Sequence, residues 1–245
     1  MSASFVHLRV HSEFSLVDGL VRIKPLIKAV SDAGMPAVAV TDQSNMSSLV
    51  EFYTTAQRQG VKPICGVDIW LASNEEDEPL TRMTLLVMTP QGYRNLIEMI
   101  SLGYTHGQRN GLAVLERDWV KQSAEGLIAL SGAKDGEIGL ALLAGDNDKA
   151  EQLLAEWQAV FNDRFYLELH RTERPNDEEH VHAAVALAAR TGVPVVATND
   201  VRFLLQEDFE AHETRVCIGE GRALDDPRRQ RVYSEQQYLK SAAEM

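Results

Sequence analysis

The sequence contains few cysteines and no long apolar run. Its 245 residues include two cysteines, Cys65 and Cys217, which excludes a disulfide scaffold and fits a reducing cytoplasm. No apolar stretch approaches the roughly 20 residues that a membrane span needs. The first residues also lack a basic region followed by an apolar segment, so no signal peptide is expected. The sequence therefore predicts a cytoplasmic protein without membrane segments.

Positive charge is scarce, and a glycine-rich phosphate loop is missing. The chain has 24 basic and 36 acidic residues, which gives a net charge of -12. Such a surface repels phosphate backbones, so this chain alone is not expected to bind DNA broadly. One basic cluster, residues 226–231, offers a local contact for DNA, although a short charge run is typical of a solvated loop. Without the phosphate loop, no nucleotide site of that kind is predicted.

The strongest pattern that is present is a repeated unit. Residues 33–42 and 191–200 each follow an amphipathic helical segment, at 24–33 and 177–191. Gly34 and Gly192 stand where a helix C-terminal cap belongs, and the proline two residues later cannot extend the helix. A short apolar run then ends in an aspartate. A looser copy at 59–68 follows the helical run 47–58. Apolar runs placed after helices predict buried parallel strands.

Strands and helices alternate along the rest of the chain. Further strands are expected at 5–10, 83–88, 126–130 and 165–169, and helices at 90–104, 137–144, 147–160 and 208–218. The alternation predicts an α/β fold, and the pattern fits a barrel as well as an open sheet. No low-complexity linker interrupts it, so a single domain over 1–245 is expected. The tail begins like a capped helix at Ser234 and then stops, which suggests a fragment with a loosely packed end.

Acidic and histidine residues gather near the predicted strand ends. The candidates are His7, His11, Asp42, Asp68, Glu168, His170 and Asp200. In a barrel the C-terminal strand ends share one face, where these side chains would suit Zn²⁺ or Mn²⁺ and activate water for phosphoester hydrolysis. Each residue alone is weak evidence, because a strand-end Asp often caps the next helix. His180 and His182 are expected on the surface, and His212 is either site-facing or exposed.

Several motifs resemble one known family in the same order. Residues 7–19, 40–45, 126–132, 197–200 and 208–213 resemble the PHP (polymerase and histidinol phosphatase) domain of C-family replicative polymerases of the gamma-proteobacterial type. The resemblance covers nearly the whole chain. It implies a distorted (β/α)7 barrel and, where complete, a trinuclear metal site. It also implies a parent chain that is a DNA-directed DNA polymerase using Mg²⁺, whose polymerase site lies beyond residue 245.

The departures from the family motifs determine the expected function. Where the intact site has histidines, or a cysteine or histidine at position 133, this chain has Arg9, Gln43, Ala133 and Arg202. The ligand-like positions that remain are His11, Asp18, Asp42, Asp68 (a glutamate in the family), Glu168 and Asp200. Arginine brings its own positive charge and pairs well with carboxylates. Arg9 and Arg202 are therefore predicted to form salt bridges with Asp18, Asp68 or Asp200 in a site without metal or catalysis.

Two functions remain open at this point. The leading hypothesis is a scaffold within a polymerase holoenzyme that docks the proofreading exonuclease subunit, a partner implied by the resemblance. This hypothesis expects no cofactor in the chain itself, and DNA bound through the parent protein. The alternative is a residual phosphoesterase, pyrophosphatase or 3′–5′ exonuclease that holds one or two Mn²⁺ or Zn²⁺ ions.

Overall fold

The computed structural model describes residues 5–73 and 79–245, which form two compact units. Of the described residues, unit 1 contains 5–65, 171–175 and 198–245, and unit 2 contains 66–73, 79–170 and 176–197. The chain therefore leaves unit 1 and returns to it twice. Segments far apart in the sequence meet in unit 1, and this arrangement places its site.

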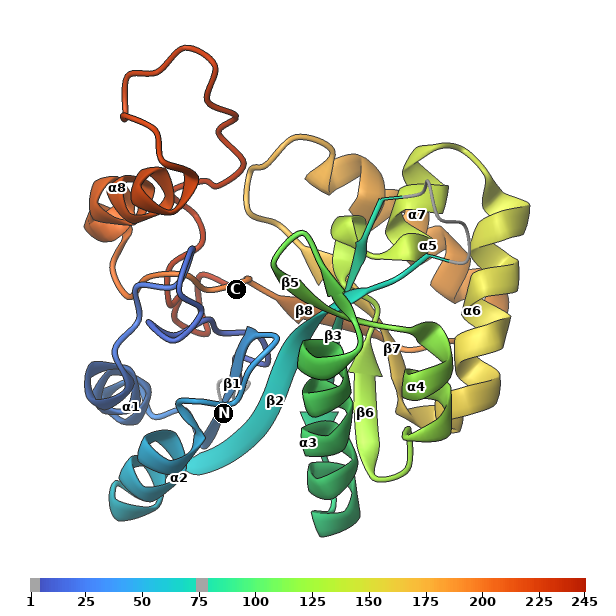
Figure 1. The fold of residues 1–245 in the computed structure, drawn as a ribbon, viewed down its shortest axis with the longest axis horizontal. Coiled ribbons are helices and arrows are strands. Elements are labelled where there is room, and N and C mark those ends of the chain that lie inside the picture. Colours follow the sequence, from blue (N-terminus) through green and yellow to red (C-terminus); the bar gives the residue numbers. More distant parts are fainter. Residues whose placement is uncertain (1–4, 74–78) are drawn as a thin grey trace. The chain divides into compact units, whose positions relative to one another are not determined.

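Unit 1 is built around the first copy of the repeated unit. Its elements are α1 (Ile23–Asp32), β1 (Ala37–Gln43), α2 (Leu49–Arg58), the 3₁₀ turn η3 (Gln206–Asp208) and α8 (Phe209–Glu220) (Figure 1). The apolar face of α1 packs with α2 and β1 in one buried cluster, as its helical spacing requires. Gly34 has a φ of 67°, the left-handed cap that the sequence predicts. The expected helix–strand unit is confirmed here.

The strand expected at residues 5–10 does not form. Residues 5–9 have no regular structure, and Val10 makes an isolated bridge with Val201. In β1, the amides of Ala39 and Thr41 donate to the carbonyls of His7 and Val10, at 2.8 Å each. The two donors are two positions apart in the sequence and the two acceptors are three positions apart, so the ladder is irregular, as at a bulge. The segment is extended and hydrogen-bonded, but it is not a strand.

The helix expected from Ser234 is also absent, and residues 234–240 are packed whereas residues 241–245 are exposed. Residues 234–245 form turns and a short bridge, and Gln237 and Lys240 are buried. The side-chain amide of Asn199 donates to the carbonyls of Gln236 and Tyr238, at 2.7 and 2.8 Å. Because buried donors need acceptors, the segment is held by its backbone carbonyls in a non-helical form. The sequence prediction was wrong for this segment.

Unit 2 contains most of the sheet. The strands are β2 (Lys62–Leu71), which begins in unit 1, β3 (Thr81–Val87), β4 (Gln108–Arg109), β5 (Leu112–Leu115), β6 (Leu127–Leu130), β7 (Phe165–His170) and β8 (Val195–Thr198). Their order is β4-β5-β2-β3-β6-β7-β8. The helices are α3 (Pro90–Thr105), α4 (Arg117–Gln122), α5 (Glu137–Leu143), α6 (Asn147–Phe161) and α7 (Asp177–Thr191), with short turns η1 (Ala133–Asp135) and η2 (Asn162–Arg164). The α/β class is confirmed.

The sequence suggested parallel strands, but the strands of the sheet are not all parallel. Strand β3 runs antiparallel to β2 and to β6, whereas β2–β5 and β6–β7 are parallel. Residues 72–80, which join β2 to β3, are too few for a parallel crossover, which takes roughly a dozen or more residues. The neighbouring strands therefore reverse direction. The sequence analysis missed this because an apolar run does not reveal strand direction.

Candidate functional site

Arg202 lies at the centre of a buried cluster in unit 1. Its Nη1 donates to Asp18 Oδ2 at 2.5 Å, and its Nη2 donates to Asp200 Oδ1 at 2.8 Å. Arg9 approaches the same oxygen of Asp200, with its Nε at 3.2 Å. All four side chains are buried. The predicted salt bridges between the two arginines and the ligand-like aspartates are present.

The cluster joins two segments that are distant in the sequence. Arg9 and Asp18 flank the turn that follows the N-terminal extended segment, and Asp200 and Arg202 follow β8. Asp200 has a φ of 47°, which an aspartate adopts more readily than most residues. Both segments are tied by the bond from His11 N to Val201 O, at 2.9 Å. The bridge at Val10–Val201 thus brings the charged residues together.

The electrostatics of the cluster favour a permanently charged Arg202. Burial alone would lower the pKa of Arg202, but the charges of Asp18 and Asp200 outweigh it and raise the pKa above its ordinary value. A guanidinium cannot release its proton to escape the cost of burial. The two carboxylates are therefore what makes a buried arginine tolerable here.

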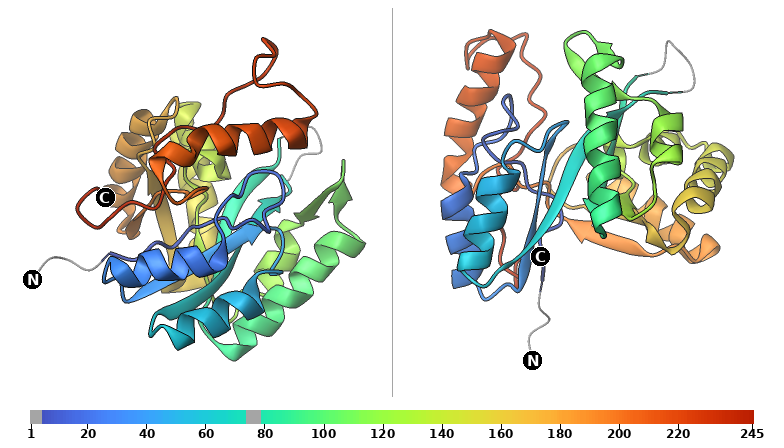
Figure 2. Two further views of the ribbon diagram at one scale, coloured as in Figure 1. Left: turned by 90° about the vertical axis from the view of Figure 1, so that its left-hand side faces the viewer. Right: turned by 60° about the horizontal axis from the view of Figure 1, so that its bottom comes forward.

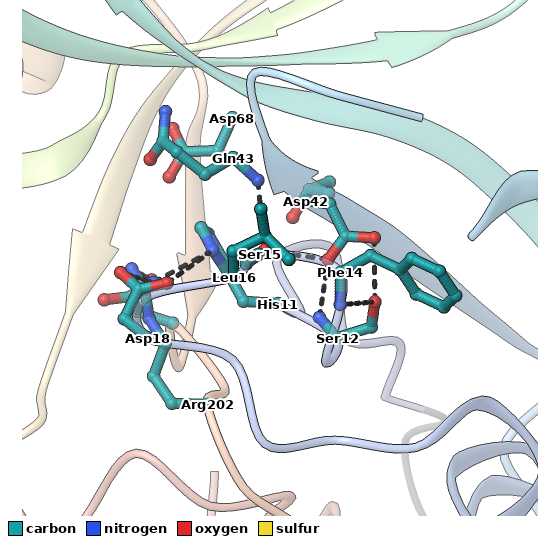
Figure 3. Close-up of polar contacts among 12 residues, drawn as sticks. His11, Ser12, Phe14, Ser15, Leu16, Asp18, Asp42, Gln43, Asp68 and Arg202 are labelled. Atoms are coloured by element: carbon teal, nitrogen blue, oxygen red, sulfur yellow. Dashed lines mark hydrogen bonds and ion pairs between the residues drawn. The ribbon is translucent and has the colours of Figure 1, made fainter. Parts of the chain in front are cut away.

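His11 takes part in the same cluster as a hydrogen-bond acceptor. Its Nδ1 lies 2.9 Å from Arg202 Nη1, as the dashed line in Figure 3 shows. Because a guanidinium only donates, Nδ1 must accept, which places the ring proton of His11 on Nε2. The Nδ1 atom of His11, which could otherwise bind a metal, is thus already hydrogen-bonded to Arg202.

The C-terminal segment completes the coordination of both aspartates. The Tyr233 hydroxyl donates to Asp18 Oδ2 at 2.9 Å, and Gln237 Nε2 donates to Asp200 Oδ2 at 2.8 Å. Arg174 adds a guanidinium 3.7 Å from the same oxygen of Asp200. Sequence reasoning missed these three residues. A tyrosine or glutamine in a tail carries no pattern that would have identified it.

His212 lies against the cluster and is buried, which resolves its two readings in favour of the site. Its ring packs 5.2 Å from Phe203 and 4.8 Å from Tyr233, centroid to centroid. Its Nε2 lies 3.0 Å from the carbonyl oxygen of Asp18. Burial, helped by the charge of Arg202, lowers the pKa of His212 to about 4. The imidazole is therefore neutral at pH 7.

Asp42 lies in unit 1 but is held by serines instead of arginines. Its carboxylate accepts from Ser12 N at 2.6 Å and from the hydroxyls of Ser12, Ser15 and Ser48, at 2.8, 2.8 and 2.6 Å. Figure 3 shows Ser12 and Ser15 turned toward it. Gln43, at a substituted ligand position, donates its backbone N–H to Ser15 Oγ at 3.1 Å. These serines, here called the serine cage, tie β1 to the loop that contains Ser12 and Ser15 and to Ser48, which precedes α2.

The remaining candidates belong to unit 2, apart from His7 of unit 1, which is buried with its Nε2 2.8 Å from the carbonyl oxygen of Lys240. Asp68 is an internal residue of β2, not its end as expected, and its Oδ2 lies 3.4 Å from Arg82 Nη1. Glu168 and His170 lie at the end of β7, with Oε1 and Nε2 3.1 Å apart. Ala133 occupies the left-handed region, with a φ of 50°. An alanine there is strained, and such strain is typical of positions shaped for function.

The prediction for His180 in unit 2 was also wrong. His180 is buried, not a surface residue, whereas His182 is exposed as expected. Burial and the neighbouring His170 lower the pKa of His180 to about 4, against the opposing charge of Asp177. Asp177 itself is buried and pairs with Lys134 at 3.0 Å. A buried polar helix face was not foreseeable from the acidic residues that start α7.

Comparisons with known proteins place these residues in a family context. Residues 7–172 match the model of the PHP domain. The whole chain is 72% identical to DNA polymerase III subunit alpha of Pseudomonas aeruginosa, and 98% of it is 46% identical to that of Escherichia coli K12. The chain spans about a fifth of these relatives, 21% in each case. The resemblance found in the motifs is confirmed.

Two solved structures share the fold at low sequence identity. A Bifidobacterium adolescentis protein described as a metal-dependent phosphoesterase matches with a TM-score of 0.52 and 14% identity, over 81% of this chain and 87% of that one. A Chromobacterium violaceum amidohydrolase with bound sulfate and no metal matches with a TM-score of 0.53 and 13% identity, over 80% and 87%. This likeness supports the predicted fold class. Among the described residues, no helix has the length and apolar character that crossing a membrane requires.

Proposed function

This chain belongs to the PHP domain family, and we propose that it acts as the scaffold domain of a replicative DNA polymerase alpha subunit. In this proposal residues 1–245 form one PHP domain whose metal site is degenerate. The domain stabilises the alpha subunit in the cytoplasm and docks the proofreading exonuclease within the holoenzyme. DNA binding and Mg²⁺-dependent nucleotidyl transfer belong to the parent protein. The identity to alpha subunits over the whole chain supports the parent.

The observation that carries the proposal is the position of the two arginines. Arg9 and Arg202 occupy ligand-like positions and contact Asp200, and Arg202 also contacts Asp18. Their two positive charges stand where the family resemblance implies metal ions. A buried carboxylate needs a positive partner, and a guanidinium supplies one permanently.

The residues of unit 1 do not fit a multinuclear metal cluster. A cation bound through His11 Nδ1, Asp18 Oδ2 and Asp200 Oδ1 would have to displace Arg202 from all three atoms. It would also face the charges of Arg9 and Arg202 in a buried site, where repulsion is poorly screened. The chemistry of the donor set therefore supports a structural ion-pair network, and no hydrolytic step is derived through it.

Metal content and nuclease activity test the proposal against the residual-hydrolase alternative. The full-length protein, purified without chelator, should contain no stoichiometric Mn or Zn in its PHP domain by inductively coupled plasma mass spectrometry. In phosphatase and 3′–5′ exonuclease assays with Mn²⁺, the wild type and Asp200→Asn should show the same background activity. Stoichiometric metal together with activity lost in Asp200→Asn would establish the hydrolase instead.

Restoring the family ligands provides the converse test. The variant Arg9→His, Gln43→His, Ala133→Cys and Arg202→His returns the donors implied by the resemblance. If only the direct metal ligands have been lost, the variant should bind metal and the wild type should not. If it folds and stays metal-free, the loss extends beyond these four positions.

A further inference from the structure

Three aliphatic side chains form an exposed surface on unit 1, here called the α8 patch: Leu16, Val17 and Ile218. Leu16 and Ile218 are 76% and 77% exposed, and Val17 is 51% exposed. Leu16 and Val17 come from the loop between His11 and Asp18, and Ile218 comes from the last turn of α8. The loop and the helix lie side by side in both views of Figure 2. Exposed large aliphatic side chains that cluster mark interaction sites more often than scattered ones do.

Contacts with α8 hold the loop in place. Arg215 donates from Nη2 to Glu13 O at 2.9 Å and from Nε to Leu16 O at 3.2 Å. Val17 lies over Gly219 so closely that a Cβ at this position would come within 3.0 Å of Val17 Cγ1. The loop that carries Leu16 and Val17 therefore packs against the last turn of α8, which also carries Ile218. A preorganised surface loses little conformational entropy when a partner binds.

The helix does not need Ile218 for its own packing. The inward face of α8 consists of His212, Glu213, Val216 and Cys217, which are buried. Ile218 points away from this face, at a position where the fold alone would favour a polar residue. An isoleucine on the outer face of the helix therefore lowers solubility and adds nothing to the packing of the core.

Two arginines, Arg215 and Arg222, stand three residues before and four residues after Ile218 and are here called the basic rim; the chain as a whole carries a net charge of -12. Arg215 donates to carbonyl oxygens, and Arg222 donates from Nη1 to Arg228 O at 2.7 Å. Among the described residues, neither forms an ion pair with a carboxylate within salt-bridge distance. Their charge is therefore not cancelled by direct pairing. Complementary charge at a rim selects partners and speeds association.

We propose that the α8 patch is the docking surface for a segment of a partner protein that presents aliphatic side chains beside carboxylates. The aliphatic residues would cover Leu16, Val17 and Ile218, and the carboxylates would pair with Arg215 and Arg222. The inference rests on the docking role proposed above and gives it a location.

Two other occupants fit the patch less well. In a twofold dimer of this chain through the patch, Arg215 and Arg222 would face the arginines of the second copy, and like charges across an interface disfavour association. Single-stranded nucleic acid is bound by aromatic stacking as well as by cations, and the patch contains no aromatic side chain.

The test uses the full-length protein with the purified proofreading exonuclease subunit of the same bacterium as the probe. The double variant Leu16→Asp, Ile218→Asp should raise the Kd at least tenfold by isothermal titration calorimetry. Val50→Asp is the matched control, because Val50 is a 76% exposed aliphatic residue of α2 outside the patch. It should stay within twofold of the wild type. Leu16→Ser, Ile218→Ser replaces the double variant if the aspartates lower the melting temperature.

The basic rim is tested by charge reversal. Arg222→Glu should weaken binding severalfold at low salt and by less in 0.5 M NaCl, because salt screens exposed charges. Arg58→Glu, an exposed arginine at the end of α2, is its control and should have no such effect. Loss of binding in both charge variants would mean a general effect of net charge, which would contradict a role for the rim.

The outcomes separate the location from the docking role. If the wild type binds the exonuclease and the patch variants bind equally well, the location is wrong and docking stands. If the wild type does not bind, the docking role fails, and this inference fails with it. If the patch variants instead change the oligomeric state by light scattering, or the affinity for a single-stranded oligonucleotide, the class of partner is wrong.

Discussion

The candidate site carboxylates of the two units are neutralised in different ways. In unit 1, Asp18 and Asp200 are held by Arg202, with further bonds from Tyr233 and Gln237. In unit 2, Asp68 has Arg82 at 3.4 Å, and Glu168 has a histidine partner that is charged only when protonated. The arginines of unit 1 stand at ligand-like positions, whereas Arg82 is an ordinary residue of β3.

Under the scaffold proposal, this difference is how a metal site is lost without loss of the fold. A buried carboxylate without a metal ion must have another positive charge nearby or become costly. In that proposal Arg9 and Arg202 supply the charge in unit 1, so the two arginines and the aspartates they contact depend on each other. We therefore expect unit 1 to be sensitive to single changes and unit 2 to tolerate them better.

The largest expected effect is that of removing Arg202. Arg202→Met leaves Asp18 and Asp200 without their main partner, and breaking a buried ion pair in this way costs about 3–5 kcal/mol. Arg82→Met in unit 2 removes one longer contact with Asp68 and should cost about 1.5–3 kcal/mol. Urea denaturation of the 245-residue chain measures both. Equal losses would remove the contrast between the units.

A compensating variant sharpens this first prediction. Adding Asp18→Asn and Asp200→Asn to Arg202→Met removes the unpaired charges, so it should recover more than about 1 kcal/mol of the loss. If the triple variant is no more stable than Arg202→Met, then Arg202 stabilises unit 1 through packing, for example against Tyr233, and not through its charge.

The next effect is a pH dependence that the two units share. His212 in unit 1 and His180 in unit 2 have pKa values lowered to about 4 by burial. An unfolded histidine titrates near 6.5, so between pH 4 and 6.5 the unfolded state holds more protons, and stability falls as the pH falls through this window. Each histidine should account for about 2–3 kcal/mol of the loss between pH 7 and 4.5.

Single substitutions separate the two histidines. His212→Gln and His180→Gln should each reduce the difference between the unfolding free energies at pH 7 and pH 4.5, whatever they do to stability at pH 7. His182→Gln is the control, because His182 is exposed and should leave the difference unchanged. If His212→Gln leaves the full pH dependence in place, then His212 is more accessible than its contacts indicate.

A smaller effect is expected at the serine cage of Asp42. Ser48→Ala removes one of four hydrogen bonds to a buried carboxylate and should cost about 1.5 kcal/mol in unfolding free energy. Ser101→Ala in α3 of unit 2 removes an exposed bond to Ile97 O and should cost less than about 0.5 kcal/mol. If the two costs are equal, Asp42 has other support and the cage is not structural.

The sequence predicts the regular elements well because they depend on local patterns. The helix at 177–191 and the glycine caps at Gly34 and Gly192 follow from helical periodicity and left-handed φ values, and the structure has them. The salt bridges of Arg9 and Arg202 were also predictable, because buried charges must pair.

The parts that the sequence misses depend on contacts between distant segments. Tyr233 and Gln237 reach Asp18 and Asp200 across more than thirty positions, and nothing in the local sequence of the tail indicates it. The buried state of His180 and the antiparallel direction of β3 are likewise tertiary properties. Each of these misses concerns where a segment packs, not what secondary structure its residues prefer.

The smallest effects on stability are expected for exposed ion pairs. These pairs test whether burial is the reason why some charged residues matter more for stability than others. Lys28 and Asp32 on α1 of unit 1 lie 2.5 Å apart, but both are largely exposed. Arg190 in unit 2 bonds Glu151 Oε1 through Nε and Nη2, at 3.0 and 2.9 Å. Water screens both pairs, so Lys28→Met should cost less than about 0.5 kcal/mol and Arg190→Met at most about 1 kcal/mol. If either change cost as much as Arg202→Met, the sensitivity of unit 1 would reflect its number of charges and not their burial.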